Sequence, residues 1–377
     1  MNREKIQEKI RKKTAAVAAV VLLAALLPGQ AGAGQAGAGQ EKGKKYEFYG
    51  DFRFRGEYDT NRSEGREGRF RERVRLRLGI LYKTGVFTLG ARLVTGNAAD
   101  PNSTHQTLGT MLNRFSLSLD RAFVTFKPGK IPLWITAGKF SHPFKTGGIY
   151  NELVWDGDVS PEGIAAGYTS GGKKIKWGLI AGDYRLVERN NETDTSLFAG
   201  QFFVETTASR IVVLAACGLY EYRNLNVDGQ AFADNAGNFA GEPERFASRF
   251  SIMDALLQIG VPGRRPVFFS LQYFKNFAAV VDRDEGYALG CSVGRTQGPG
   301  DYKVYYQYQV VEQDAVFSPF SQDDFLQQTN FGGHLFGVKY NVASSVNLNL
   351  WGLLSKMDFP RAGEYQVRFR LDLNIKF

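Results

Sequence analysis

The last thirteen residues of the chain alternate without exception between apolar and polar side chains. The apolar positions are Tyr365, Val367, Phe369, Leu371, Leu373, Ile375 and Phe377, and the polar ones between them are Gln366, Arg368, Arg370, Asp372, Asn374 and Lys376. A period of two predicts a β-strand with one apolar and one polar face. Soluble strands are usually about 3–10 residues long, whereas a tilted strand that crosses a bilayer needs about 9–11 residues. In a membrane barrel the apolar face contacts lipid and the polar face lines a lumen.

The same alternation predicts sixteen strands in all. They fall near 46–58, 69–82, 86–95, 115–127, 132–140, 162–169, 174–184, 196–205, 209–222, 247–260, 266–276, 285–294, 301–311, 333–341, 346–355 and 365–377. Long connections follow the odd strands and tight turns follow the even ones, which is typical of an outer-membrane barrel with both termini on the periplasmic side. The pattern therefore predicts an all-β fold, a transmembrane antiparallel up-and-down β-barrel over residues 46–377. Because Ile211 to Ala216 is apolar on both faces, fourteen or eighteen strands are alternatives.

The N-terminus carries six Lys or Arg residues, then an apolar run from Thr14 to Leu27 and the small-residue site Ala31-Gly32-Ala33. This order predicts a secretory signal peptide over residues 1–33, with cleavage at 38 as an alternative, because the run is too short to span about 30 Å of hydrocarbon as a helix. Residues 34–45 read as a flexible linker. Loss of the signal lowers the formal net charge from +9 to +5, so binding to nucleic acid is not expected.

Arginines gather on the polar faces of the first three strands and the last one. The nine positions are Arg53, Arg55, Arg71, Arg73, Arg75, Arg77, Arg92, Arg368 and Arg370. On a lipid face each would cost about 2–4 kcal/mol at mid-depth, so we expect them to line one side of a water-filled pore that attracts anions. The alternative is the solvated outer face of a soluble sheet.

One long connection, residues 141–161, combines acids with aromatic side chains. We expect Glu152, Trp155, Asp156, Asp158 and the adjacent Glu162 to form the loop side of a constriction opposite the arginines. Phe144 and Tyr150 favour a loop that folds inward, because a solvated loop gains little from aromatic residues. The alternative is an extracellular loop of solvated acids.

This loop also carries a resemblance. LVWDGD at 153–158 followed by PEG at 161–163 resembles the loop signature of the bacterial putative porin family, as do TGN at 95–97, QTLG at 106–109, LDRA at 119–122 and GKF at 138–140 with Pro143 and Phe144. These motifs cover residues 46–170, and the terminal Phe377 is similar to the outer-membrane assembly signal. The resemblance implies an outer-membrane β-barrel porin and names no solute. Many porins of this size are homotrimers, so a homotrimer is a further expectation.

Candidate catalytic and metal-binding residues are few. His105, His142 and His334 lack metal-ligand spacing, and Cys217 and Cys291 are too few for a disulfide framework. We therefore expect no enzyme activity, no cofactor and no metal site. The sequence predicts an outer-membrane porin for passive diffusion of small hydrophilic solutes, with anion preference, in contact with outer-membrane lipid and lipopolysaccharide. The alternatives are a barrel enzyme, hydrolysing lipid or peptide, and a plugged structural or adhesive barrel.

Overall fold

The computed structural model describes residues 45–60, 68–172, 174–190, 193–225, 237–241, 245–325, 327–357 and 365–377. The predicted signal peptide and nearly all of the linker lie outside these residues. Within the described part, no helix has the length and apolarity needed to cross a membrane.

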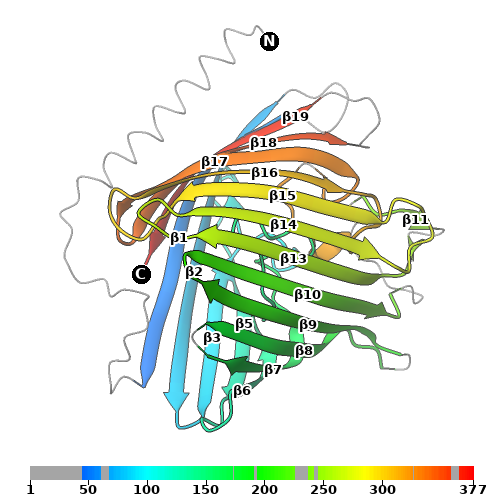
Figure 1. The fold of residues 1–377 in the computed structure, drawn as a ribbon. Coiled ribbons are helices and arrows are strands. Elements are labelled where there is room, and N and C mark those ends of the chain that lie inside the picture. Colours follow the sequence, from blue (N-terminus) through cyan, green and yellow to red (C-terminus); the bar gives the residue numbers. More distant parts are fainter. Residues whose placement is uncertain are drawn as a thin grey trace, which may run out of the picture.

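Sixteen long strands in the described residues form one antiparallel wall (Figure 1). They are β1 (Tyr46–Asp59), β2 (Arg69–Thr84), β3 (Phe87–Thr95), β5 (Leu117–Phe126), β6 (Leu133–Lys139), β7 (Glu162–Gly171), β8 (Ile175–Val187), β9 (Thr195–Ala208), β10 (Ile211–Arg223), β13 (Ser251–Val261), β14 (Val267–Asn276), β15 (Glu285–Gly294), β16 (Tyr302–Val311), β17 (Phe331–Ala343), β18 (Val346–Met357) and β19 (Gln366–Lys376). The short elements are β4 (Gln106–Thr107), which pairs with β2, the separate pair β11 (Ala240–Gly241) and β12 (Arg245–Phe246), and the 3-10 helix η1 (Ser318–Phe320). The predicted all-β barrel of sixteen strands is confirmed.

The wall closes between the first and last strands. β1 pairs with β19 from Asp51 opposite Lys376 to Asp59 opposite Arg368. At the chain end, the amide of Gly50 donates to the carbonyl of Phe377 at 2.9 Å, and the amide of Phe377 donates back at 3.1 Å. Closure satisfies the backbone groups that an open sheet edge would leave unpaired.

Side chains alternate between an exposed apolar outer face and a buried polar inner face. Leu89 of β3 is 46% exposed, whereas Arg92 on the opposite face of that strand is 6% exposed. In β19 the corresponding values are 44% for Phe369 and 2% for Arg370. This order inverts that of a soluble sheet and matches a wall with lipid outside and polar groups inside.

Part of the interior is apolar, a feature that the alternation alone does not predict. Trp155 lies 6.3 Å, between ring centroids, from both Tyr184 of β8 and Tyr220 of β10. From the connection between β16 and β17, Phe317 approaches Tyr222 at 4.7 Å. Because two inward loops pack against this side, strands such as β10 carry apolar residues on both faces. The ambiguity over Ile211 to Ala216 thus has a physical cause.

The two cysteines are free. Cys217 is exposed and Cys291 is partly buried, so neither is a fully packed core thiol.

Candidate functional site: an arginine-rich wall facing acidic loops

The register of β19, β1 and β2 arranges inner-face side chains in rows across the wall. One row reads Asn374, Arg53 and Arg75, and the next reads Asp372, Arg55 and Arg73. Arginines therefore stand directly opposite each other twice between β1 and β2. Like charges in opposed positions destabilise a sheet, so this part of the wall needs acids from elsewhere.

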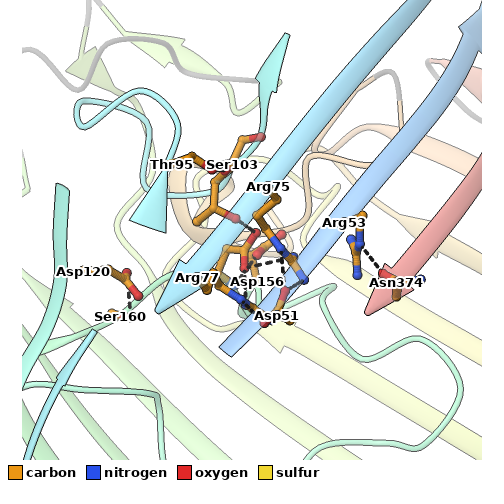
Figure 2. Close-up of polar contacts among 12 residues, drawn as sticks. Asp51, Arg53, Arg75, Arg77, Thr95, Ser103, Asp120, Asp156, Ser160 and Asn374 are labelled. Atoms are coloured by element: carbon orange, nitrogen blue, oxygen red, sulfur yellow. Dashed lines mark hydrogen bonds and ion pairs between the residues drawn. The ribbon is translucent and has the colours of Figure 1, made fainter. Parts of the chain in front are cut away.

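Some of these acids come from the same strands. Asp372 accepts two hydrogen bonds from Arg55, at 2.7 and 3.1 Å. Asp51 accepts from Arg75 at 2.8 Å and from Arg77 at 2.7 Å, and Figure 2 shows the two guanidinium groups converging on it. Bidentate and charge-assisted bonds of this kind are the stronger ones in proteins.

The rows that contain Glu57 and Asp59 of β1 also have ion pairs. Glu57 of β1 forms ion pairs with Arg71 of β2 and Arg370 of β19. Asp59 lies 3.1 Å from Arg71 and 3.6 Å from Arg368. The nine predicted arginines lie on the inner side of the wall, and most of them are neutralised in part by a carboxylate.

A β-bulge in the pairing of β3 with β5 allows β5 to join this network of ion pairs and hydrogen bonds. The register of β3 and β5 shifts between Arg92 and Leu93, with Arg121 opposite Arg92 and Leu119 opposite Leu93. Asp120, the extra residue, forms an ion pair with Arg92, and Arg121 donates to Ser160 at 3.1 Å. Bulges of this kind re-aim side chains, and here two successive residues both take part in the inner network.

The loop between β6 and β7 supplies further acids. Asp158 accepts from Arg77 at 3.3 Å and from the Thr104 hydroxyl at 2.9 Å, and lies 3.9 Å from Arg75. The loop is held by packing: Leu153 is fully buried, and Trp155 is 3% exposed and donates to the Val159 carbonyl at 3.3 Å.

A second inward loop, between β16 and β17, was not predicted as part of the site. Asp324 forms an ion pair with Arg370 and accepts from the Tyr150 hydroxyl at 3.2 Å. Arg368 donates to the Asp323 carbonyl at 3.3 Å. The signal was present in the sequence, because Asp323 and Asp324 follow aromatic residues in a long connection, just as in the first loop.

Between the wall and the two loops lies a cavity of about 300 Å³. Its charged lining consists of Arg53, Arg55, Arg75, Arg77, Lys339, Glu152, Asp156, Asp158, Asp323, Asp324 and Asp372, together with His105. Apart from the arginines, Glu152, Asp156 and Asp158, sequence reasoning did not select these residues.

The loop acids differ in protonation. Burial, reinforced by neighbouring acids, raises the pKa of Glu152 to about 8 and that of Asp156 well above its ordinary value. Burial also raises the pKa of Asp323, to about 6. Burial would raise the pKa of Asp158 too, but Arg75 and Arg77 outweigh it and lower the pKa. Glu152 is therefore largely protonated at pH 7.

Two predicted site residues lie apart from the cavity. Glu162 pairs with Lys139 at 2.7 Å on the exposed side of the barrel, so it is not brought to the arginines. Trp155, a residue of the loop itself, is buried in the hydrophobic cluster and does not line the cavity. Within the described residues, no group of three His, Cys, Asp or Glu side chains could hold a metal ion.

A sequence model of the putative porin family matches residues 58–244. The chain belongs to this family. The family predicted from the sequence motifs is thus confirmed, and the porin match includes most of the arginine wall and all of the first inward loop. A search of curated proteins finds no significant match.

Solved structures give the same fold for this porin. The high-pH structure of Pseudomonas putida OprB matches with a TM-score of 0.61 at 12% identity, over 88% of this chain and 94% of that chain. Salmonella typhi OmpF, solved in complex with daunomycin, matches with 0.54 at 9% identity, over 88% and 97%. Vibrio cholerae OmpT lacking loop L8 matches with 0.51 at 11% identity, over 88% and 99%. Family and fold together make this chain a porin-type transmembrane barrel of the outer membrane.

Proposed function

We propose that this porin lets small hydrophilic solutes diffuse passively across the outer membrane, with a preference for anions. The observation that carries the proposal is the register that sets Arg53 opposite Arg75 and Arg55 opposite Arg73 beside the cavity. Cationic groups along a low-dielectric wall focus the potential and raise the local concentration of anions. This function involves no chemical step and no cofactor.

The charge balance of the cavity supports the sign of the preference. Five cationic side chains and six acids line the cavity. Because burial raises the pKa values of Glu152 and Asp156, both acids shift toward their neutral forms and contribute less negative charge than the other four. The balance of the lining therefore moves toward positive charge, and this favours anions at the cavity.

The loop side of the constriction is assigned to Glu152, Asp156 and Asp158, with Trp155 anchoring the loop from below. Ion pairs from Asp158 to the arginines hold the loop at a fixed distance from the wall. Such a pore has a transverse field, with guanidinium groups on one side and carboxylates on the other. Glu162 is left out of this assignment, because its partner is Lys139.

The test is conductance of the purified protein in a planar bilayer with a KCl gradient. The reversal potential is expected to show chloride as more permeant than potassium. Arg53→Gln and Arg75→Gln should each lower the chloride-to-potassium permeability ratio, whereas Lys83→Gln, in an exposed pair with Glu47, should leave it unchanged. Cation preference in the unaltered protein would contradict the proposal, and a barrel that conducts nothing would favour the plugged structural alternative.

The proposal extends to assembly and export. The exposed apolar outer face, with residues such as Leu89 and Phe369, suits contact with outer-membrane lipid and lipopolysaccharide, and a homotrimer is the proposed assembly. Native mass spectrometry of the detergent-solubilised protein would count the subunits. Peptide sequencing of the mature N-terminus tests cleavage after residue 33 or residue 38.

A further inference from the structure

The cavity contains cationic side chains that have no carboxylate partner. Arg53 donates to the neutral amide oxygen of Asn374 at 2.6 Å, as Figure 2 shows. Lys339 of β17 lies 5.7 Å from the ring centroid of Tyr305. Among the described residues, neither Arg53 nor Lys339 has an acid within ion-pair distance, although most other arginines of this wall do.

The acidic side of the same cavity is likewise incomplete. Glu152 and Asp323 come from the two inward loops, and both line the cavity. Within the part of the chain that the structure describes, neither carboxyl has a cationic side chain within ion-pair distance. Asp324, the neighbour of Asp323, is by contrast paired with Arg370. Buried charges without partners are costly, so both sides of the cavity are suited to a charged solute.

Part of the cavity lining is apolar. Ile149, Leu335 and Trp351 also contribute apolar surface to its lining. The volume of about 300 Å³ lies at the lower end of the range of about 300–1,000 Å³ that is usual for small-molecule sites. A small solute with a short apolar body and charged ends fits these dimensions.

We propose that this cavity binds small zwitterionic solutes of the amino-acid class during passage through the barrel. The solute carboxylate lies against Arg53 and Lys339. Its ammonium group lies against Asp323 and against Glu152, which releases its proton to solvent when the cationic group binds. A simple anion would complete only the basic side and leave the acidic side without a partner. The inference rests on the proposed porin function and names a solute class for the same cavity.

The experiment compares three solutes that share a four-carbon body: 4-aminobutyrate, butyrate and butylamine. Binding to the detergent-purified full-length protein is measured by isothermal titration calorimetry, and block of single-channel current is measured in a planar bilayer. We expect 4-aminobutyrate to bind at least tenfold more tightly than either singly charged solute and to produce resolvable current interruptions. Equal affinity for all three solutes, or tighter binding of butyrate, would overturn the inference.

Variants separate the two ends of the solute. Arg53→Gln should weaken 4-aminobutyrate and butyrate by a similar factor and spare butylamine. Glu152→Gln should weaken 4-aminobutyrate and butylamine and spare butyrate. Glu162→Gln, which alters an exposed pair outside the cavity, should change none of the three, and circular dichroism checks that each variant keeps its strands. If Arg53→Gln and Glu152→Gln both leave zwitterion binding unchanged, the assigned ends are wrong.

The calorimetric and electrical readouts also keep the two proposals distinct. A channel that conducts with anion preference but treats the three solutes alike leaves the porin function intact and removes the zwitterion site. A barrel that binds 4-aminobutyrate tightly without conducting removes the diffusion function and retains the site.

Discussion

Raising the pH through the titration of Glu152 should weaken the anion preference. Burial, and then the nearby charges of Asp324 and Asp158, raises the pKa of this carboxyl to about 8. An acid with a raised pKa is neutral below that value and charged above it, so one negative charge appears beside the cavity between about pH 7 and pH 9. A unit charge about 6 Å from a permeating ion is worth ~0.7 kcal/mol in water. The new negative charge raises the free energy of a permeating anion by this amount and lowers that of a cation by the same amount. The anion-to-cation permeability ratio should therefore fall by about tenfold.

Other titratable groups share the cavity with Glu152, so the Glu152→Gln variant is needed to isolate its contribution. The charged or titratable groups of the cavity that surround it are Arg53 from β1, Lys339 from β17, Asp323 and Asp324 from the second loop, Tyr150, Asp156 and Asp158 from its own loop, and His105. Burial lowers the pKa of His105 well below its ordinary value, and the arginines lower it further. His105 is therefore neutral across this pH range and adds no step of its own.

The assay is the reversal potential in a KCl gradient at pH 6, 7, 8 and 9, at low salt so that screening stays weak. Glu152→Gln should remove most of the fall between pH 7 and pH 9 and keep the change near pH 6 that comes from Asp323. Glu162→Gln should reproduce the unaltered profile, because Glu162 pairs with Lys139 on the exposed side. An anion preference that rises with pH, or a fall of the same size in Glu152→Gln, would refute the reasoning.

Three other substitutions test the ion-pair network and the backbone of the wall. Asp158→Asn removes a counter-charge from two arginines and should increase chloride selectivity in the same bilayer assay; a decrease would contradict it. Asp324→Asn leaves buried Arg370 with only Glu57 as its acid and should cost about 1.5–3 kcal/mol, the range for a hydrogen bond to a charged group, measured by thermal unfolding followed by circular dichroism; an unchanged midpoint would argue against it. Gly138→Ala should lower the unfolding midpoint, because Gly138 has φ +115 and an added Cβ would lie 2.2 Å from the Ala122 carbonyl oxygen; equal stability would count against that clash.

Period-two alternation was enough to predict the wall. The strand predicted over 285–294 coincides with β15, and the others agree within a few residues at each end. The signal is strong because lipid and lumen impose opposite polarity on successive residues. The same rule placed Arg73 and Arg75 on the inner face, where they are 9% and 6% exposed.

Contacts between distant segments could not be read from alternation. Period two assigns a face to Asp51, but only the register of β1 and β2 sets it opposite Arg77. The second loop was missed although Asp323 and Asp324 follow aromatic residues in a long connection, the same local signal that indicated the first loop. Lys339 and Trp351 were missed because they become neighbours of β1 only when the barrel closes. Glu162 was predicted in the site because it adjoins the loop in sequence. In the structure it is the first residue of β7, stands opposite Lys139 of β6 and forms an ion pair with it.

Arginine number alone does not determine the field in this lumen. The row of Arg55 and Arg73 would repel strongly if it were bare, and Asp372 together with the loop acids makes the arrangement tolerable. Carboxylates of the wall and the loops thereby neutralise much of the guanidinium charge. What remains for a solute depends on the few groups without partners and on which acids hold protons. Selectivity in this porin should therefore respond more to Glu152 and Arg53, which lack ion-pair partners among the described residues, than to arginines already matched by a carboxylate.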